Sequence, residues 1–178
     1  MFTALSSLLI ILALALGGSG AAVAAAQSSQ PDDLLYGLKL TSENMRMEME
    51  GDPADAYQLA LAFAERRALE IQTMLQGGGV PPEPIQARYQ AQVEQAIQLA
   101  LNQPDDQAVQ ALAQIKTRLQ TQEQAMLQIH AGGLPDVEAA LVRTRAMLQE
   151  RLQWVEAGLI DPVQLREMLR LRNAGGET

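Results

Sequence analysis

The feature that most constrains the fold is a series of helix-period apolar patterns separated by short groups of glycine and proline. In residues 53–76, apolar side chains recur every three or four positions, at Leu61, Ala64, Ala68, Ile71 and Leu75. The spacing recurs later, at Val93, Ile97 and Leu101; at Leu112, Ile115, Leu119, Met126 and Ile129; and at Val137, Leu141, Met147 or Leu148, Leu152 and Val155. Such spacing places the apolar side chains on one face of an α-helix. Because strand-like alternation is absent, the sequence predicts an all-α fold.

Glycine and proline set the expected helix boundaries. The expected helices cover roughly residues 32–50, 53–76, 84–102, 104–130, 135–157 and 161–172. Pro53 and Pro135 stand in first turns, where proline is tolerated, and Gly158 is expected to end the fifth helix. Connections of about 2–8 residues favour antiparallel neighbours. We therefore predict an up-and-down helical bundle or long helical hairpins, with Gln and Arg on the outer faces.

An uncharged N-terminal segment predicts export. The 13 basic and 21 acidic residues all lie from Asp32 onward, and the apolar residues 5–16 are followed by small residues at 21–26. This suits a signal peptide cleaved after Ala26, but residues 2–26 also exceed the roughly 20 residues that cross a bilayer, so a retained membrane anchor stays an alternative. The lack of basic residues before the apolar core leaves the orientation open and points to a start further upstream.

These patterns divide the chain into four parts. Residues 1–26 are a signal peptide or membrane anchor, 27–31 a linker, 32–172 a helical extracytoplasmic domain, and 173–178 a tail expected to fray. The domain is expected to be periplasmic or extracellular, or anchored in the membrane and facing outside the cytoplasm.

Charge and composition exclude several function classes. The net charge of −8 disfavours binding to nucleic acid, which needs basic residues to displace counterions from phosphates. The chain has no cysteine, so disulfides, thiolate nucleophiles and cysteine metal sites are absent. We therefore expect the domain to be held together by packing alone.

Two segments carry a family resemblance. Residues 30–46 read Gln-Pro-Asp-Asp-Leu-Leu-Tyr-Gly-Leu-Lys-Leu-Thr-Ser-Glu-Asn-Met-Arg, and the next segment contains Asp52-Pro53, Leu59, Ala64-Glu65-Arg66-Arg67 and Glu70 before the break at residues 77–79. Roughly residues 30–130 resemble a bacterial domain of unknown function that follows the membrane span in anti-sigma-factor-like and other exported proteins. The resemblance implies an extracytoplasmic helical domain that is sensory or protein-binding.

The resemblance does not extend to sigma-factor binding. Family members attached to anti-sigma proteins carry a cytoplasmic sigma-binding domain before the membrane span, often with a His/Cys zinc motif. This sequence shows neither feature. Sigma-factor binding is therefore not expected from these residues.

Met45, Met47 and Met49 form the segment most similar to a metal site. Thioethers are soft ligands for Cu(I), and Met45 and Met49 share a helical face. Met47 points elsewhere at this spacing, and methionine commonly fills gaps in packed cores. We therefore interpret Met45 and Met49 as packing residues, with copper binding as the alternative.

The other polar candidates have structural explanations. His130 is the only histidine and is expected to be a polar residue at a helix end, not a metal ligand or general base. A catalytic triad would have to combine this histidine with Ser28, Ser29 or Ser42. We do not expect such a triad. An acidic stretch comprises Glu43, Glu48, Glu50, Asp52 and Asp55. It lacks the spacing of an EF-hand loop, and we expect its side chains to be exposed to solvent. Two carboxylate pairs are expected at helix N-termini, at Asp32-Asp33 and Asp105-Asp106.

The sequence assigns no catalytic, cofactor-binding or metal-binding residue, and no cofactor. The leading expectation is a non-enzymatic extracytoplasmic helical domain that binds a protein or peptide or senses the state of the envelope. If the N-terminal segment is not cleaved, the chain is also expected to contact the membrane through it. The alternative is a periplasmic-type metal or stress-binding helical protein. An exposed apolar groove between helices favours the first class, and stabilisation by a metal favours the second.

Overall fold

The computed structural model describes residues 36–175, in which six α-helices and no strand occur. The helices are α3 (Tyr36–Met49), α4 (Pro53–Gln76), α5 (Glu83–Leu101), α6 (Asp105–Leu127), α7 (Pro135–Ile160) and α8 (Pro162–Gly175). The chain divides into two compact units, Met1–Glu48 and Met49–Thr178. The predicted leader, the linker and residues 176–178 lie outside the described residues. The prediction of an all-α fold is confirmed for the described range.

In the first unit, the described residues belong to α3. This helix ends with a basic side chain, Arg46, in its last turn, where a positive charge interacts favourably with the helix dipole. The hydroxyl of Ser42 donates a hydrogen bond of 2.8 Å to the carbonyl oxygen of Lys39. Helix α3 therefore contains residues 36–46, the described part of the segment that resembles the family motif.

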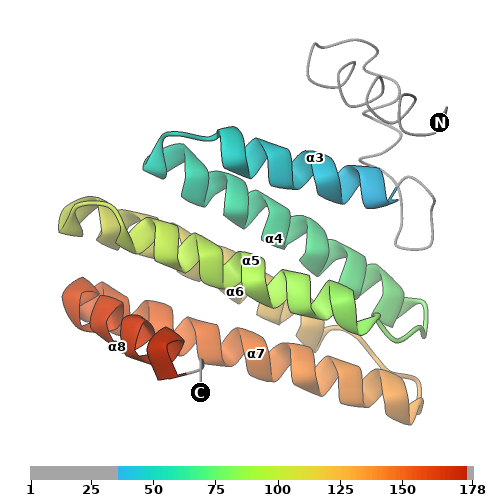
Figure 1. The fold of residues 1–178 in the computed structure, drawn as a ribbon. Helices are drawn as coiled ribbons and strands as arrows, with labels where there is room; N and C mark the ends of the chain where they lie inside the picture. Colours follow the sequence, from blue (N-terminus) through green and yellow to red (C-terminus); the bar gives the residue numbers. More distant parts are fainter. Residues whose placement is uncertain (1–35, 176–178) are drawn as a thin grey trace, which may run out of the picture. The chain divides into compact units, whose positions relative to one another are not determined.

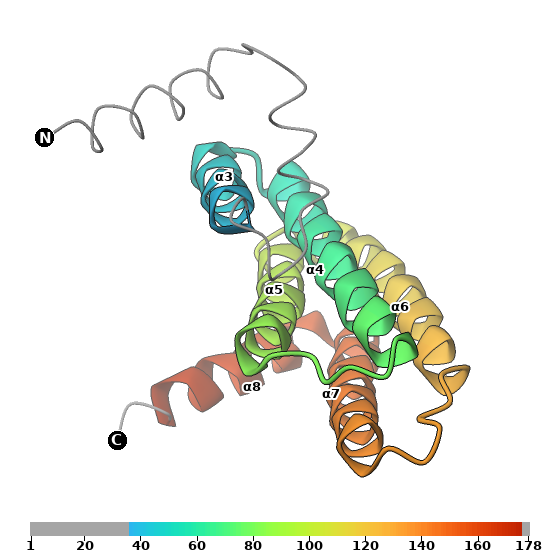
Figure 2. The same ribbon diagram turned by 90° about the vertical axis from the view of Figure 1, so that its right-hand side faces the viewer.

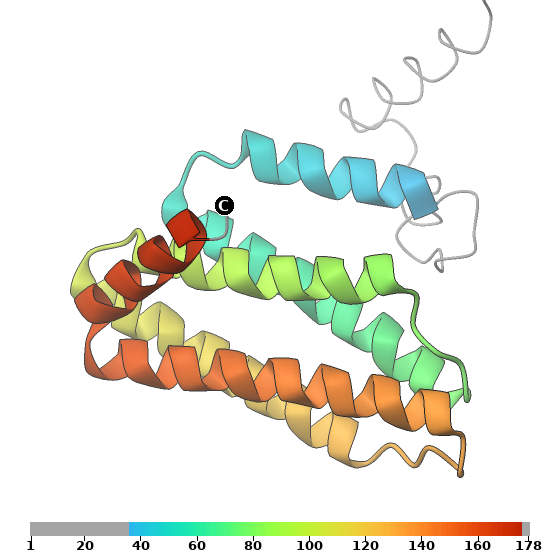
Figure 3. The same ribbon diagram turned by 60° about the horizontal axis from the view of Figure 1, so that its bottom comes forward.

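In the second unit, α4 to α7 form an up-and-down bundle built from two antiparallel hairpins (Figures 1 and 2). The most extensive packing joins α4 to α5 and α6 to α7, while contacts between the two pairs are fewer. Helix α8 turns back after α7 and packs on α7, α6 and α5 (Figure 3). The structure therefore has features of both predicted arrangements, a bundle assembled from long hairpins.

Local sequence signals explain most helix boundaries. The side chain of Asp52 caps α4 by accepting a 2.8 Å hydrogen bond from the backbone N–H of Ala54, and Pro53 follows in the first turn. The break after α4 contains Gly78 at φ 75°, a conformation that glycine adopts without steric cost. Asp105 and Asp106 lie in the first turn of α6, as predicted. Helix α6 ends at Leu127 and α8 continues to Gly175, so these two ends differ from the predicted ones by about one turn.

The predicted core is confirmed. Every helix-period apolar residue named from the sequence is buried, with Leu148 rather than Met147 taking the core position in α7. Two arginines, Arg67 and Arg151, are also buried, which contradicts the expectation that the arginines occupy the outer faces. The bundle therefore encloses charged groups that the apolar pattern alone does not reveal.

The predicted helix end at Gly158 is wrong. Helix α7 runs through this residue to Ile160, and Gly158 is buried. A Cβ atom on Gly158 would lie 2.5 Å from Cδ2 of Leu165 and 2.8 Å from Cδ1 of Leu112. The glycine is present because α8 and α6 approach the backbone of α7 there, not because the helix stops.

Candidate functional site

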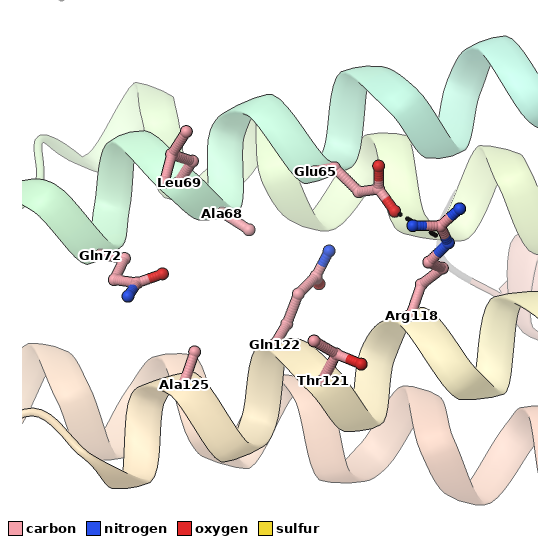
Figure 4. Close-up of a pocket in the computed structure, with 8 residues that line it drawn as sticks. All are labelled: Glu65, Ala68, Leu69, Gln72, Arg118, Thr121, Gln122 and Ala125. Carbon is pink, nitrogen blue, oxygen red and sulfur yellow. Dashed lines mark ion pairs between the residues drawn. The ribbon is translucent and has the colours of Figure 1, made fainter.

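A groove of about 260 Å³ lies between α4 and α6 (Figure 4). Its walls are Glu65, Ala68, Leu69 and Gln72 from α4, and Arg118, Thr121, Gln122 and Ala125 from α6. Each set follows the i, i+3, i+4, i+7 spacing, so each forms one continuous face of its helix. Two turns of one helix thus face two turns of the other across the groove.

The groove exists because small side chains meet where the two hairpins join. The side chains of Ala68 and Ala125 are too short to reach across the groove. Both lie away from the end of the groove at which Figure 4 marks an ion pair. Helix α4 packs mainly on α5, and α6 mainly on α7, so the joint between α4 and α6 is less tightly packed than either hairpin. Leu69 borders this space with 63% of its surface exposed.

One ion pair bridges the groove at its other end. Nε of Arg118 lies 3.3 Å from Oε1 of Glu65 (Figure 4). The side chains are 61% and 37% exposed, respectively. Pairs this exposed contribute only about 0–1 kcal/mol, because water and salt screen them. An incoming charged group can therefore exchange with either partner at little cost.

Tyr89 of α5 reaches the groove from the core. It is buried, and its hydroxyl donates a hydrogen bond to Oε1 of Gln122. Burial, with a smaller contribution from the negative charge of Glu65, raises the pKa of Tyr89 well above its ordinary value. The phenol therefore stays protonated and acts as a hydrogen-bond donor that fixes the Gln122 amide in the groove wall.

A second polar contact joins α4 and α6 beyond the groove. The hydroxyl of Tyr57 donates a 3.2 Å hydrogen bond to Oε1 of Gln114, and Nε2 of Gln58 donates a 2.8 Å hydrogen bond to the Tyr57 hydroxyl. Polar contacts thus connect α4 and α6 one to two turns before the groove. The unbridged part of the joint is the segment lined by Leu69, Gln72 and Ala125.

A separate charged cluster joins α5, α7 and α8. Arg151 of α7 is only 2% exposed and forms ion pairs with Glu94 of α5 and Glu150 of α7. The guanidinium carbon atoms of Arg151 and Arg172 each lie 4.3 Å from the ring centre of Trp154. Arg172 of α8 also lies 3.5 Å from Glu94. This cluster holds three helices together.

The three methionines predicted as a metal site or packing cluster lie on α3 and differ in exposure. Met49 is 82% exposed and Met45 is also exposed, while Met47 is partly buried. The interpretation of Met45 and Met49 as core-filling residues is therefore wrong, because neither side chain lies in a closed apolar environment. Copper binding by these thioethers stays an untested alternative.

The remaining polar candidates have structural roles where the structure describes them. His130 is exposed just beyond α6, and its Nδ1 lies 3.1 Å from the carbonyl oxygen of Gln128. In the acidic stretch, Glu43 is buried, so the expectation that the whole stretch is solvated is wrong at this residue. Asp52 caps α4, and Oε1 of Glu50 accepts a 3.2 Å hydrogen bond from the Asp52 backbone N–H. Between residues 36 and 175, no three His, Cys, Asp or Glu side chains gather in a way that could hold a metal ion. Asp32, Asp33, Ser28 and Ser29 lie outside the described residues.

The comparison with known families gives one match. Residues 28–122 match the family described as Domain of unknown function (DUF5667). This span is more than half of the 178 residues. The chain belongs to this family. The sequence-based resemblance is thus confirmed at the level of a domain of unknown function, while the association with anti-sigma-like proteins stays a prediction.

The DUF5667 match includes most of the groove. It covers α3, α4, α5 and α6 as far as Gln122, so Ala125 is the one groove-lining residue beyond it. Helices α7 and α8 follow the matched residues but belong to the same compact unit as α4 to α6. No curated protein and no solved structure matches the chain.

Sequence reasoning missed both the groove and the charged cluster of this DUF5667 protein. The cluster had a signal: Arg151 falls between the core positions Leu148 and Val155, and it lies three residues before the only tryptophan, Trp154. A long cation at a core position needs a carboxylate or an aromatic partner. The groove had no comparable signal, because which faces of α4 and α6 oppose each other depends on how the two hairpins are packed.

No helix between residues 36 and 175 has the length and apolar character needed to cross a membrane. The predicted export or membrane helix falls in residues 1–26, which lie outside the described part.

Proposed function

We propose that the chain is a non-enzymatic, exported helical domain that binds a protein or peptide partner in the groove between α4 and α6 and reports on the envelope through that partner. The observation that carries this proposal is the exposure of Leu69 in a groove that has small or uncharged side chains around this leucine and the Glu65–Arg118 ion pair at its other end. An exposed leucine beside an unfilled space costs free energy in water, and a partner that covers it recovers this free energy.

The size of the groove favours a peptide side chain over a cofactor. Pockets for small-molecule ligands usually enclose about 300–1,000 Å³ and bury most of the ligand. The groove encloses about 260 Å³ and is partly open to solvent. It is suited to one or two side chains projecting from a larger partner.

The walls favour an amphipathic helix as that partner. Both walls are helix faces two turns long, and their backbone groups are engaged within the helices, so an added β-strand finds no pairing edge. A helix can place small apolar side chains against Ala68 and Ala125 and polar groups near Gln72 and Gln122. The net charge of −8 favours a partner with basic residues, one of which can pair with Glu65 in place of Arg118.

Site-specific photo-crosslinking in the native envelope tests the groove. A photoreactive amino acid is placed at Leu69 or Thr121, which line the groove, and at Val142 of α7 as the control, which is exposed but does not line it. We expect the same partner to be captured from both groove positions and not from Val142. The captured partner is then titrated against the Leu69→Asp variant, which should bind about tenfold or more weakly because a buried carboxylate is unfavourable. Equal capture from Val142, or unchanged affinity of Leu69→Asp, would contradict the proposal.

The proposed location outside the cytoplasm is tested separately. Residues 1–40 are fused to a reporter that is active only after export, and we expect activity because the first 31 residues carry no charged side chain. N-terminal sequencing of the product then distinguishes cleavage near Ala26 from a retained membrane anchor. A reporter that stays in the cytoplasm would overturn this part of the proposal without affecting the groove.

A further inference from the structure

The core fixes the orientation of the Gln122 side-chain amide in the groove between α4 and α6. The hydroxyl of Tyr89, which is 1% exposed, donates a hydrogen bond to Oε1 of Gln122. This phenol stays protonated because burial raises its pKa, and a buried hydroxyl without an acceptor is strongly unfavourable. The amide oxygen of Gln122 is therefore held toward the core, and the amide nitrogen is left to face the groove.

The nitrogen of this amide is an oriented hydrogen-bond donor. Figure 4 shows Nε2 of Gln122 directed from α6 toward α4, between Ala68 and Glu65. An amide nitrogen carries two N–H donors and no acceptor. Among residues 36–175, no group accepts a hydrogen bond from this nitrogen. A ligand that enters the groove therefore meets a donor whose direction is already set.

The charge beside this donor decides which acceptor suits it. Glu65 lies close enough to Tyr89 for its negative charge to contribute to the raised pKa of the phenol. Arg118 pairs with Glu65 at this end of the groove. A carboxylate on the ligand would compete with Glu65 for this arginine, and two carboxylates beside one cation repel each other. An uncharged carboxamide avoids the repulsion, because its oxygen accepts from Gln122 and its nitrogen donates to Glu65.

A second tyrosine–glutamine contact between α4 and α6 already includes a third side chain, the amide of Gln58. The hydroxyl of Tyr57 donates a 3.2 Å hydrogen bond to Oε1 of Gln114. Nε2 of Gln58 donates hydrogen bonds of 2.8 Å to the Tyr57 hydroxyl and 3.4 Å to Oε1 of Gln114. A carboxamide is thus accommodated beside such a contact. Within the described residues, no third amide bonds to the Tyr89–Gln122 contact, and the groove leaves room for one from a ligand.

We propose that the groove recognises the side-chain carboxamide of an asparagine or glutamine on its protein partner, with Gln122 as the hydrogen-bond donor. The inference rests on the proposed function, because it names the polar group that the partner helix places between Ala68 and Glu65. Tyr89 does not touch this group. It is a positioning residue, which determines specificity by holding the acceptor end of Gln122 in the core.

Three small probes of similar size test this specificity without the partner: propionamide, propionate and propylammonium. They are titrated into the isotope-labelled full-length chain, and the backbone amide signals of Ala68 and Ala125, which line the groove, report binding. We expect propionamide to bind at least about threefold more tightly than either ion, because it alone combines an acceptor with zero charge. The signal of Val142, which is exposed but does not line the groove, is the control and should show no saturable shift.

Three variants distinguish positioning by Tyr89 from a structural role. In Tyr89→Phe the amide oxygen of Gln122 is free to face the groove, so the preference for propionamide over propylammonium should fall to within about twofold, with helical circular dichroism retained. Gln122→Glu keeps an acceptor for Tyr89 but presents a carboxylate oxygen to the groove, so propylammonium should become the tightest probe. Gln114→Glu adds the same charge to α6 at the Tyr57 contact and should keep propionamide as the tightest probe.

The outcomes separate this inference from the proposed function. Equal binding of the three probes to the wild-type chain, or an unchanged preference in Tyr89→Phe, would overturn the recognition of a carboxamide. If Leu69→Asp still weakened binding of a captured partner, the groove would then bind through apolar contacts alone. A preference for propionamide together with unchanged partner binding by Leu69→Asp would refute the proposed partner site but support carboxamide recognition.

Discussion

Leu165 of α8 occupies the position that a side chain on Gly158 of α7 would need, since its Cδ2 lies 2.5 Å from the site of that Cβ. Gly158→Ala should therefore lower the free energy of unfolding by about 1 kcal/mol, because overpacking costs about 1–3 kcal/mol and the better helix propensity of alanine returns about 1 kcal/mol. Chemical denaturation measures the change. Hydrogen exchange should show the loss of protection mainly in α8.

Gly51→Ala is the matched control for this prediction. No heavy atom lies within 4 Å of a Cβ on Gly51, and its φ is not positive. The substitution should change the free energy of unfolding by less than about 0.5 kcal/mol. If Gly158→Ala proved as harmless as Gly51→Ala, close packing of α8 on α7 would be contradicted.

Glu94→Gln tests the buried charge on Arg151. The substitution removes the negative charge of Glu94 and leaves an arginine that is 2% exposed with Glu150 as its remaining carboxylate partner. We expect a loss of about 1.5–3 kcal/mol in unfolding free energy, the usual range for hydrogen bonds to charged groups. Glu156→Gln, which breaks the more exposed pair with Lys116, should cost less than about 1 kcal/mol. If both variants lost the same unfolding free energy, burial of the Arg151 charge would not depend on the carboxylate of Glu94.

The sequence predicts the helices and their apolar faces well because both depend on local spacing. The first turns at Pro53, Asp105 and Pro135 and the buried positions Ile71, Ile97 and Ile115 follow from this rule. Gly158 was misinterpreted because glycine ends a helix in one context and admits a neighbouring helix in another. Only the tertiary arrangement distinguishes the two.

The candidate site was less predictable for the same reason. Periodicity shows that α4 and α6 each bury a face, but not that Glu65 and Arg118 meet across a joint between hairpins. Met45 and Met49 share a helical face as predicted, yet that face is exposed. An apolar pattern within one helix does not specify its partner, so residues that act across two helices require the packed structure.

Tyr89→Phe should change how stability depends on pH. At neutral pH the variant loses the hydrogen bond to Gln122 and about 1 kcal/mol of unfolding free energy. Burial raises the pKa of Tyr89 in the folded protein, so above the ordinary value of about 10 the unfolded chain releases this proton while the folded chain retains it. Stability from Tyr89 is therefore present below about pH 10 and is lost above it at up to about 1.4 kcal/mol per pH unit.

Denaturation of both proteins between neutral pH and high pH measures this dependence. Above about pH 10, the unfolding free energy of the wild-type chain should fall more steeply than that of Tyr89→Phe. The wild-type chain is therefore the more stable protein at neutral pH, and the variant becomes the more stable one at high pH. Other groups that titrate in this range are present in both proteins and cancel in the comparison. Parallel curves would contradict the burial of an un-ionised phenol at this position.

Replacing Met45 and Met49 together by leucine separates an inert exposed pair from a copper site. Both side chains are exposed, so the double variant should change the free energy of unfolding by less than about 0.5 kcal/mol, whereas Met126→Leu in the core can cost up to about 1.5 kcal/mol. We expect Cu(I) to leave the melting temperature of both proteins unchanged, because two thioethers on a solvent-exposed helix face form an incomplete ligand set for a soft ion. Thermal melting with and without Cu(I) under reducing conditions measures this. Stabilisation by micromolar Cu(I) that disappears in the double variant but persists in Met126→Leu would establish the copper site and refute this prediction.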